Sequence, residues 1–264
     1  CQQMGIKVVD IQHGKQGRDH FLCIPWFNFP KEGSELLPNH FWVWGQPVNA
    51  LVEEALDTGI QQHKPLIGGN QWLGEWARDC HQGLAQVKDF AQRFEANAQF
   101  ILVTIQPIAD PLPSNLVNVI KSSPTNWVWW FRLHPKQRPE LLNIEAILAD
   151  SHVVFDVEQA TKLPLYPLLE RADCHITAWS TVAFEAEALN TPTVLFHDFS
   201  KSIFNQEIAT GRFHFAKNPT ELRRNIEALL GTSTQTTNKN RFIEVDELPA
   251  QKILNQLAKS NRLR

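Results

Sequence analysis

Short apolar segments alternate with amphipathic segments along most of this chain, and this alternation constrains the fold more than any other feature. The pattern is typical of βα units, in which helices join parallel strands. The segments richest in β-branched and aromatic residues are predicted strands: 6–11, 41–44, 65–67, 99–105, 127–133, 152–156, 174–177 and 193–196. Several are apolar on both faces, as the central strands of a parallel sheet are.

The intervening segments carry apolar residues three and four positions apart, which favours helices packed on that sheet. The predicted helices cover residues 47–58, 83–96, 113–122, 139–150, 181–190, 202–210, 219–230 and 246–259. The fold class that follows is α/β, with Rossmann-like parallel sheets.

Strands and helices alternate most regularly over residues 97–230, a length that suits one complete α/β domain. Residues 1–96 hold fewer strands and longer loops, so we predict that they form the trailing part of a second α/β domain. A polar linker and a last helix make up residues 231–264. The chain begins at Cys1 without an initiator Met. We therefore expect a truncated N-terminal domain, which leaves open whether this chain is active by itself.

The charge balance argues against a nucleic-acid partner. Lys and Arg number 25 against 28 Asp and Glu, so no basic excess would attract a nucleic-acid backbone or an anionic membrane. No apolar run approaches the roughly 20 residues that span a bilayer. The four cysteines lie far apart, so we expect reduced thiols and no metal site. We predict a cytoplasmic protein with at most peripheral association with the inner face of the membrane.

Polar side chains follow several predicted strands, and such side chains line the crevice where parallel sheets bind ligands. Arg132, His134 and Lys136 end the strand 127–133 and suit a phosphate. A solvated loop that caps the next helix would carry the same residues, and the motif alone does not decide. Gln106 follows the strand 99–105, at another strand end on the same crevice, and is predicted with these residues to bind the nucleotide or its phosphates.

A second group follows the strand 174–177. Ser180 and Thr181 lie where a helix is predicted to begin, and they would bind an anion or simply cap that helix. Glu185 comes one turn later, where a carboxylate can accept hydrogen bonds from a ribose diol or merely complement the helix dipole. Trp179, beside this group, is a candidate for stacking on a sugar ring.

A third group lies in the polar loop after the first strand. His13 is a candidate general base, because histidine is the side chain that most often has this role, and Asp10 is the second candidate. A lone loop histidine is more often structural or merely exposed. The sequence holds no signature of a nucleoside triphosphate loop, a dinucleotide fingerprint or a hydrolase elbow.

The order of these motifs resembles the C-terminal nucleotide-binding domain of GT-B glycosyltransferases. Gln106-Pro107 is similar to the QP motif, and His134-Pro135 to the HP motif, of bacterial capsule and lipopolysaccharide transferases. That group includes Kdo transferases, HP-motif sialyltransferases and CDP-polyol phosphotransferases. The segments 10–14, 37–45 and 67–70 are similar to the end of the acceptor-side domain in capsule-type transferases.

The resemblance implies GT-B architecture and transfer of a sugar from a nucleotide-sugar to a carbohydrate acceptor in surface-polysaccharide synthesis, without a metal or a cofactor. It implies that the phosphates lie near His134, Ser180 and Thr181, the ribose near Glu185 and the acceptor near His13. UDP-N-acetylglucosamine epimerases share the architecture but carry an Asp-Ser-Gly-Gly run where this chain has Ala-Trp-Ser-Thr at 178–181, which disfavours epimerase activity.

Two alternatives stay open: a CDP-polyol phosphotransferase, and a catalytically silent module that binds carbohydrate or nucleotide. The sequence does not specify the donor sugar, the base of the donor, the anomeric outcome or the acceptor. It does not specify the oligomeric state either.

Overall fold

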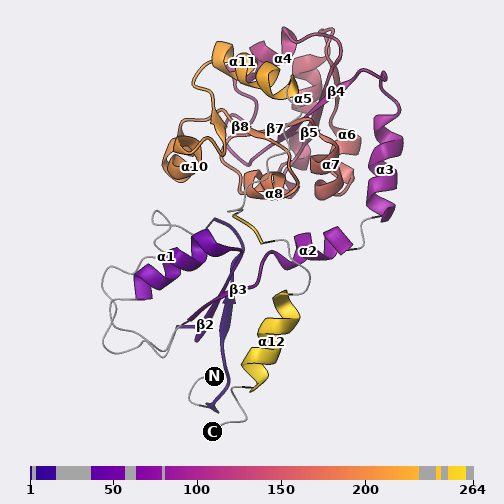
Figure 1. The fold of residues 1–264 in the computed structure, drawn as a ribbon. Coiled ribbons are helices and arrows are strands. Elements are labelled where there is room, and N and C mark those ends of the chain that lie inside the picture. The colour runs from indigo at the N-terminus through magenta and orange to yellow at the C-terminus, as the bar shows by residue number, and fades with distance from the viewer. Residues whose placement is uncertain are drawn as a thin grey trace. The chain divides into compact units, whose positions relative to one another are not determined.

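A computed structural model of the chain describes residues 1, 4–15, 37–56, 64–78, 81–231, 242–244 and 249–259 (Figure 1). The chain forms two compact units, Cys80–Thr237 and Cys1–Asp79 together with Asn238–Arg264. Each unit contains a parallel sheet, so the predicted α/β fold class is confirmed. In the described part of the chain, no helix is both long and apolar enough to cross a membrane.

The unit Cys80–Thr237 is built on a six-stranded parallel sheet with the order β6-β5-β4-β7-β8-β9. The strands are β4 (Gln99–Thr104), β5 (Trp127–Arg132), β6 (Val154–Asp156), β7 (Cys174–Thr177), β8 (Thr193–Leu195) and β9 (His214–Phe215). In chain order, β5 and then β6 are added on one side of β4, and β7, β8 and β9 are then added on its other side. The strand order therefore reverses between β4 and β7, and ligands of open α/β sheets bind beyond the carboxyl ends at such a point.

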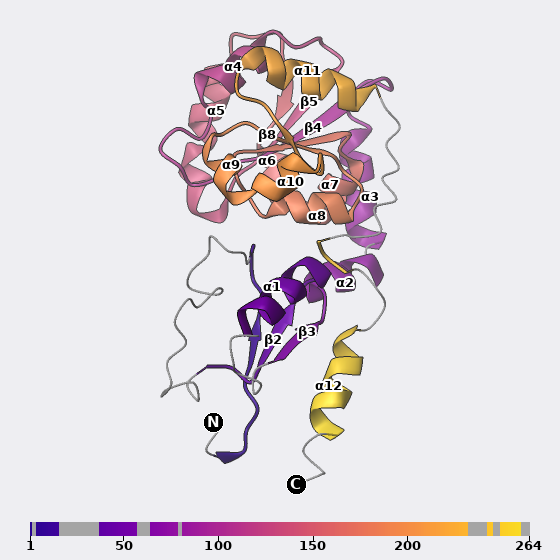
Figure 2. The same ribbon diagram turned by 60° about the vertical axis from the view of Figure 1, so that its left-hand side comes forward.

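Helices cover both faces of this sheet (Figure 2). One face is covered by α4 (Ser114–Lys121), α5 (Leu141–Leu148) and α11 (Pro219–Leu230), and the other by α3 (His81–Ala91), α7 (Leu165–Arg171) and α8 (Val182–Ala188). Shorter helices lie in the connections: η3 (Pro135–Glu140), α6 (Glu158–Lys162), α9 (Phe199–Ile203) and α10 (Asn205–Ala209).

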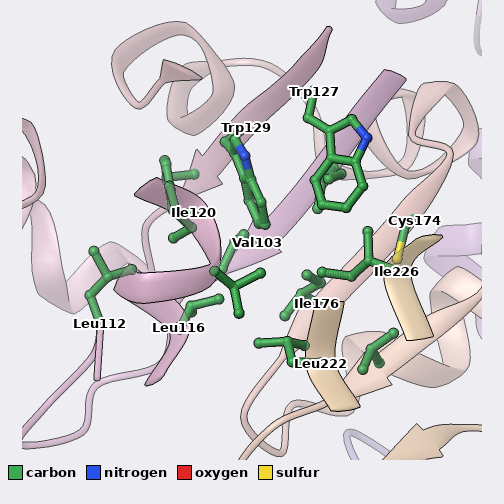
Figure 3. Packing of buried hydrophobic residues seen from close by; sticks show 14 of the residues in the cluster. Val103, Leu112, Leu116, Ile120, Trp127, Trp129, Cys174, Ile176, Leu222 and Ile226 are labelled. Carbon is green, nitrogen blue, oxygen red and sulfur yellow. The ribbon is translucent and has the colours of Figure 1, made fainter. Parts of the chain in front are cut away.

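Strand β5 shows why both faces must be covered, because its bulky side chains alternate between them. Trp127 and Trp129 belong to a buried cluster that includes Leu116 and Ile120 of α4 and Leu222 and Ile226 of α11 (Figure 3). The indole N–H of Trp129 donates to Ser123 Oγ at 3.0 Å, so its burial leaves no donor unpaired.

Trp130 points to the opposite face and stacks on Phe90 of α3, with 5.1 Å between the ring centroids. Through this contact α3 belongs to the unit of the six-stranded sheet. The boundary between the units therefore lies between Asp79 and Cys80, ahead of the predicted division after residue 96.

The other unit contains a parallel sheet in the order β1-β2-β3, made of β1 (Val9–Ile11), β2 (His40–Val43) and β3 (Lys64–Ile67). Its helices are α1 (Gln46–Leu56), α2 (Gln71–Arg78) and α12 (Pro249–Lys259). Two hydrogen bonds of 2.8 Å tie the C-terminal segment to it: Glu244 N donates to Trp44 O, and Lys7 Nζ donates to Leu257 O. Of the predicted linker, residues 232–241 lie outside the described residues.

Every predicted strand and helix is present. The bounds of 174–177 and 219–230 are as predicted, the other elements have shifted ends, and the predicted helix 202–210 is divided between α9 and α10. The structure adds β9, α2, η3, α6 and α7, which the sequence analysis missed. Strand β9 has two residues and helix α6 has five, which are too few to show a hydrophobic period.

Gly68, after β3, is packed against an aromatic ring. A Cβ at this position would lie 1.9 Å from Trp42 Cε2. Trp42 is buried, and its Nε1 donates to Gly69 O at 3.0 Å, so the indole cannot move aside without losing that bond. We predict that Gly68→Ala lowers the free energy of unfolding by about 2 kcal/mol or more in urea denaturation.

The control for this variant is Gly74→Ala in α2, where no atom lies within 4 Å of the added Cβ. Alanine is the better helix former, so Gly74→Ala is expected to raise the free energy of unfolding by up to about 1 kcal/mol. Equal effects of the two substitutions would contradict the packing of Trp42 against Gly68.

Candidate functional site

Gln106 joins the two strands between which the strand order reverses. It follows β4, and its Oε1 accepts a hydrogen bond of 2.6 Å from the backbone N–H of Trp179, which follows β7. The Gln106 carbonyl oxygen accepts a second hydrogen bond, from the side-chain amide of Gln137 in η3. The loops after β4, β5 and β7 are thus connected at the carboxyl edge of the sheet. This edge is the candidate functional site.

His134 lies in the turn after β5, at the same edge. Its Nδ1 accepts a hydrogen bond of 3.2 Å from the backbone N–H of Lys136. An accepting Nδ1 places the proton of the neutral imidazole on Nε2, so Nε2 is a hydrogen-bond donor. His134 is partly buried and Lys136 is exposed. Their assignment to an anion site stays a prediction.

Ser180 and Thr181 lie at the start of α8, close to the predicted helix start. Ser180 Oγ accepts from Val182 N at 3.3 Å, and Thr181 occupies the N-cap position without a side-chain cap hydrogen bond. Because Trp179 is bonded to Gln106, the start of this helix is connected to the loop after β4.

Glu185 is held by a residue that the sequence analysis missed. Its Oε1 accepts a hydrogen bond of 2.8 Å from the hydroxyl of Tyr166, a buried residue of α7. Tyr166 lies in a seven-residue helix that contains a proline, and no motif marks it. Its bond to Glu185 fixes the orientation of the carboxylate in the first turn of α8.

Arg132 makes contacts that differ from those predicted for it. Its Nη1 donates to the carbonyl of Ala160 at 3.1 Å and to that of Leu163. These carbonyls belong to the C-terminal end of α6, where backbone acceptors have no partner within the helix. Burial lowers the pKa of the Arg132 guanidinium. The side chain is therefore used to cap α6.

Asp10 and His13 lie in the other unit. Asp10 is paired with Phe41 within the sheet, and the exposed His13 follows β1 with its Nδ1 3.3 Å from Ile11 O. Between them, the buried Gln12 accepts a hydrogen bond of 2.7 Å from Trp44 N and donates one of 2.8 Å to Gly14 O. The sequence analysis missed Gln12, which connects the ends of β1 and β2 as Gln106 connects those of β4 and β7.

A buried histidine links three strands of the larger sheet. In β7, Nε2 of His175 lies 2.8 Å from Thr104 Oγ1 of β4, and Nδ1 lies 3.0 Å from Thr193 Oγ1 of β8. Desolvation by burial lowers the pKa of His175 to about 3, so the ring is neutral at pH 7. This row of polar groups holds together the two strands at the reversal point and the strand next to them.

Metal ligands do not gather in this structure: the described residues contain no group of three or more His, Cys, Asp or Glu side chains that could hold a metal ion.

Comparisons with known proteins identify the fold. No family model and no curated protein matches the sequence. Among solved structures, S. aureus MnaA with UDP matches with a TM-score of 0.65 and 13% identity over 100% of this chain and 72% of that chain. The UDP-GlcNAc 2-epimerase from Methanocaldococcus jannaschii matches with a TM-score of 0.63 and 16% identity, over 97% of this chain and 71% of that one.

The wall teichoic acid polymerase TagF, solved with CDPG, is a more distant match. Its TM-score is 0.50 at 15% identity, over 84% of this chain and 57% of that chain. At such identities these likenesses show the fold alone. The fold is the GT-B type, with Rossmann-like parallel sheets, as the sequence predicted.

The neutral state of His175 predicts a specific pH dependence. Below the ordinary pKa of 6.5 the unfolded chain binds a proton on His175 that the folded chain excludes down to about pH 3. Folding stability therefore falls as the pH falls through this window, by up to about 1.4 kcal/mol per pH unit from this residue.

The variant His175→Asn tests this dependence. It is expected to lose about 1–3 kcal/mol at pH 7, because its hydrogen bonds to the two threonines are lost or weakened. The difference from the wild type should narrow between pH 6.5 and pH 4 in urea denaturation, since the variant has no proton to bind there. If the free energies of unfolding of the two proteins change with pH in parallel, His175 is not held neutral in the folded chain.

Proposed function

We propose that this chain binds a nucleotide-sugar at the carboxyl edge of the six-stranded sheet and transfers the sugar to a carbohydrate acceptor. The observation that carries the proposal is the bond between Gln106 and Trp179, which connects the loops on the two sides of the reversal point. Ligands of open α/β sheets bind at this point. The GT-B fold of the chain agrees with a nucleotide-sugar as the ligand.

The phosphates of the donor are proposed to lie between the loops after β5 and β7. The Nε2–H of His134 and the ammonium of Lys136 would donate to phosphate oxygens, and such charge-assisted bonds are strong. Ser180 and Thr181 would supply hydroxyl groups from the second loop. Donors held in place before the reaction stabilise the leaving phosphate as its charge develops, so no metal ion is required for that step. Arg132 is left out of this site because its guanidinium caps α6.

The ribose is proposed to lie against Glu185. The hydrogen bond from Tyr166 fixes the carboxylate, which suits it to accept bonds from the two ribose hydroxyls.

The acceptor is proposed to approach His13, with Asp10 as the second candidate. The general base removes the proton of an acceptor hydroxyl, and the oxygen attacks the anomeric carbon of the donor sugar. The bond from that carbon to the phosphate oxygen breaks, and the nucleotide leaves with the bonding electrons. We further propose that the reaction serves surface-polysaccharide synthesis in the cytoplasm, with at most peripheral association with the membrane.

The likeness to TagF, which was solved with CDPG, supports a second candidate function, the transfer of a polyol phosphate from a CDP-linked donor. Mass spectrometry of the product separates the two reactions, because only the second adds phosphorus to the acceptor. Sugar binding without turnover of any donor would favour the third alternative, a catalytically silent module.

We predict that the chain binds UDP, CDP or CMP in isothermal titration calorimetry, and that His134→Ala weakens this binding about tenfold or more. The substitution removes a hydrogen bond to a charged group, which contributes about 1.5–3 kcal/mol. Failure of the wild-type chain to bind any of the three nucleotides would contradict the proposed function. An unchanged dissociation constant for His134→Ala would contradict the phosphate site.

The role of Glu185 is tested with a matched pair of ligands. The wild-type chain is expected to bind a ribonucleotide several-fold more tightly than the corresponding 2′-deoxynucleotide, because the latter offers one hydroxyl fewer. In Glu185→Ala this preference should disappear, while the deoxynucleotide keeps most of its affinity. Retention of the full preference in the variant would place the ribose elsewhere.

A further inference from the structure

Three aromatic side chains beyond β7 and β8 form a cluster that the proposed nucleotide contacts do not use. The Trp179 ring makes T-shaped contacts with the rings of His197, at 4.4 Å between centroids, and Phe199, at 5.3 Å. Trp179 and His197 are partly buried, whereas Phe199 is 53% exposed. The aromatic cluster therefore presents a phenyl ring to solvent at the edge of the sheet where ligands bind.

Hydrogen bonds hold the aromatic cluster in place from both sides. Trp179 N is bonded to Gln106 at 2.6 Å, and His197 Nδ1 accepts from Phe199 N at 3.1 Å. The second bond leaves the proton of a neutral His197 ring on Nε2, which makes that atom a donor. The rim is polar, since Asp198 and Lys201 form an exposed ion pair of 2.7 Å beside Phe199. An apolar surface with one hydrogen-bond donor in a fixed position, here His197 Nε2–H, and a charged rim is typical of a binding site for a small molecule.

We propose that the aromatic cluster stacks on the sugar ring of the donor and determines which donor sugar is accepted. This inference rests on the proposed function. One face of a pyranose ring presents C–H groups, which pack on aromatic side chains, while hydroxyls at its rim bind donors such as His197 Nε2–H.

The position of the aromatic cluster favours the sugar over the base. Glu185 and Tyr166 lie on α8 and α7 and offer polar groups for the ribose. His197 and Phe199 instead follow β8, the strand next to β7 on the side away from β4. The contact of 4.4 Å between the ring centroids of Trp179 and His197 shows that the loop after β8 lies beside the loop that carries Ser180. A donor whose phosphates reach Ser180 would therefore have its sugar within reach of the aromatic cluster.

The test compares each nucleotide with its own sugar conjugate. Calorimetry measures the binding of UDP, UDP-glucose and UDP-N-acetylglucosamine, of CDP and CDP-glycerol, and of CMP and CMP-sialic acid. The wild-type chain is expected to bind at least one conjugate with a sugar ring more tightly than its nucleotide. Phe199→Ala should weaken that conjugate about tenfold, the size of one aromatic contact, and leave the nucleotide alone unchanged. CDP-glycerol, which has no ring, should be insensitive to the substitution.

Ile147→Ala is the matched control, because Ile147 is also an exposed apolar residue of this unit, 38% accessible on α5. It is expected to change no affinity. Trp179→Phe keeps an aromatic ring and should retain part of the preference for the conjugate. Melting curves check that each variant is folded.

Three results would overturn the inference alone. The first is equal weakening of nucleotide and conjugate, which would mean that the base stacks on Phe199, and the second is no weakening of either. A wild-type chain that binds nucleotides but prefers no conjugate with a sugar ring would also overturn it. Failure of the wild-type chain to bind any nucleotide would instead overturn the proposed function, and the inference with it.

Discussion

The hydrogen bond from Trp179 N to Gln106 Oε1 is the contact on which the candidate site depends. This bond connects the loops after β4 and β7, and the bond from Gln137 to the Gln106 carbonyl adds the loop after β5. Catalytic and binding groups act best when their supporting residues fix them in advance. Gln106 gives that support to Ser180, to Trp179 and, through η3, to the turn of His134.

The fold was predictable where the sequence of an element shows a clear hydrophobic pattern. Strands β4 and β5 read as continuous apolar runs because helices bury both of their faces, and α11 shows its stripe of Leu222, Ile226 and Leu229. Strand β9 and helix α6 have two and five residues, too few to carry a period. The packing of Phe90 on Trp130, a contact distant in sequence, shows that α3 belongs to the larger unit.

The candidate site was predictable in position and less so in detail. His134, Ser180 and Gln106 could be singled out because they follow strands, and the carboxyl ends of parallel strands meet at one edge. The contacts of Arg132 could not be foreseen, because its acceptors lie in a helix that the sequence did not reveal. Tyr166 matches no motif, Gln12 lies within a motif that does not reveal its role, and each acts through a partner distant in sequence. Side chains that position other residues are specified by tertiary contacts, which local patterns do not record.

The central claim is that a nucleotide binds at the reversal point between β4 and β7. A crystal structure of the chain soaked with UDP, CDP or CMP tests it most directly. The account predicts phosphate oxygens within hydrogen-bond distance of His134 Nε2 and of the Ser180 hydroxyl, with the ribose against Glu185. A nucleotide bound away from the carboxyl edge of the six-stranded sheet would contradict it.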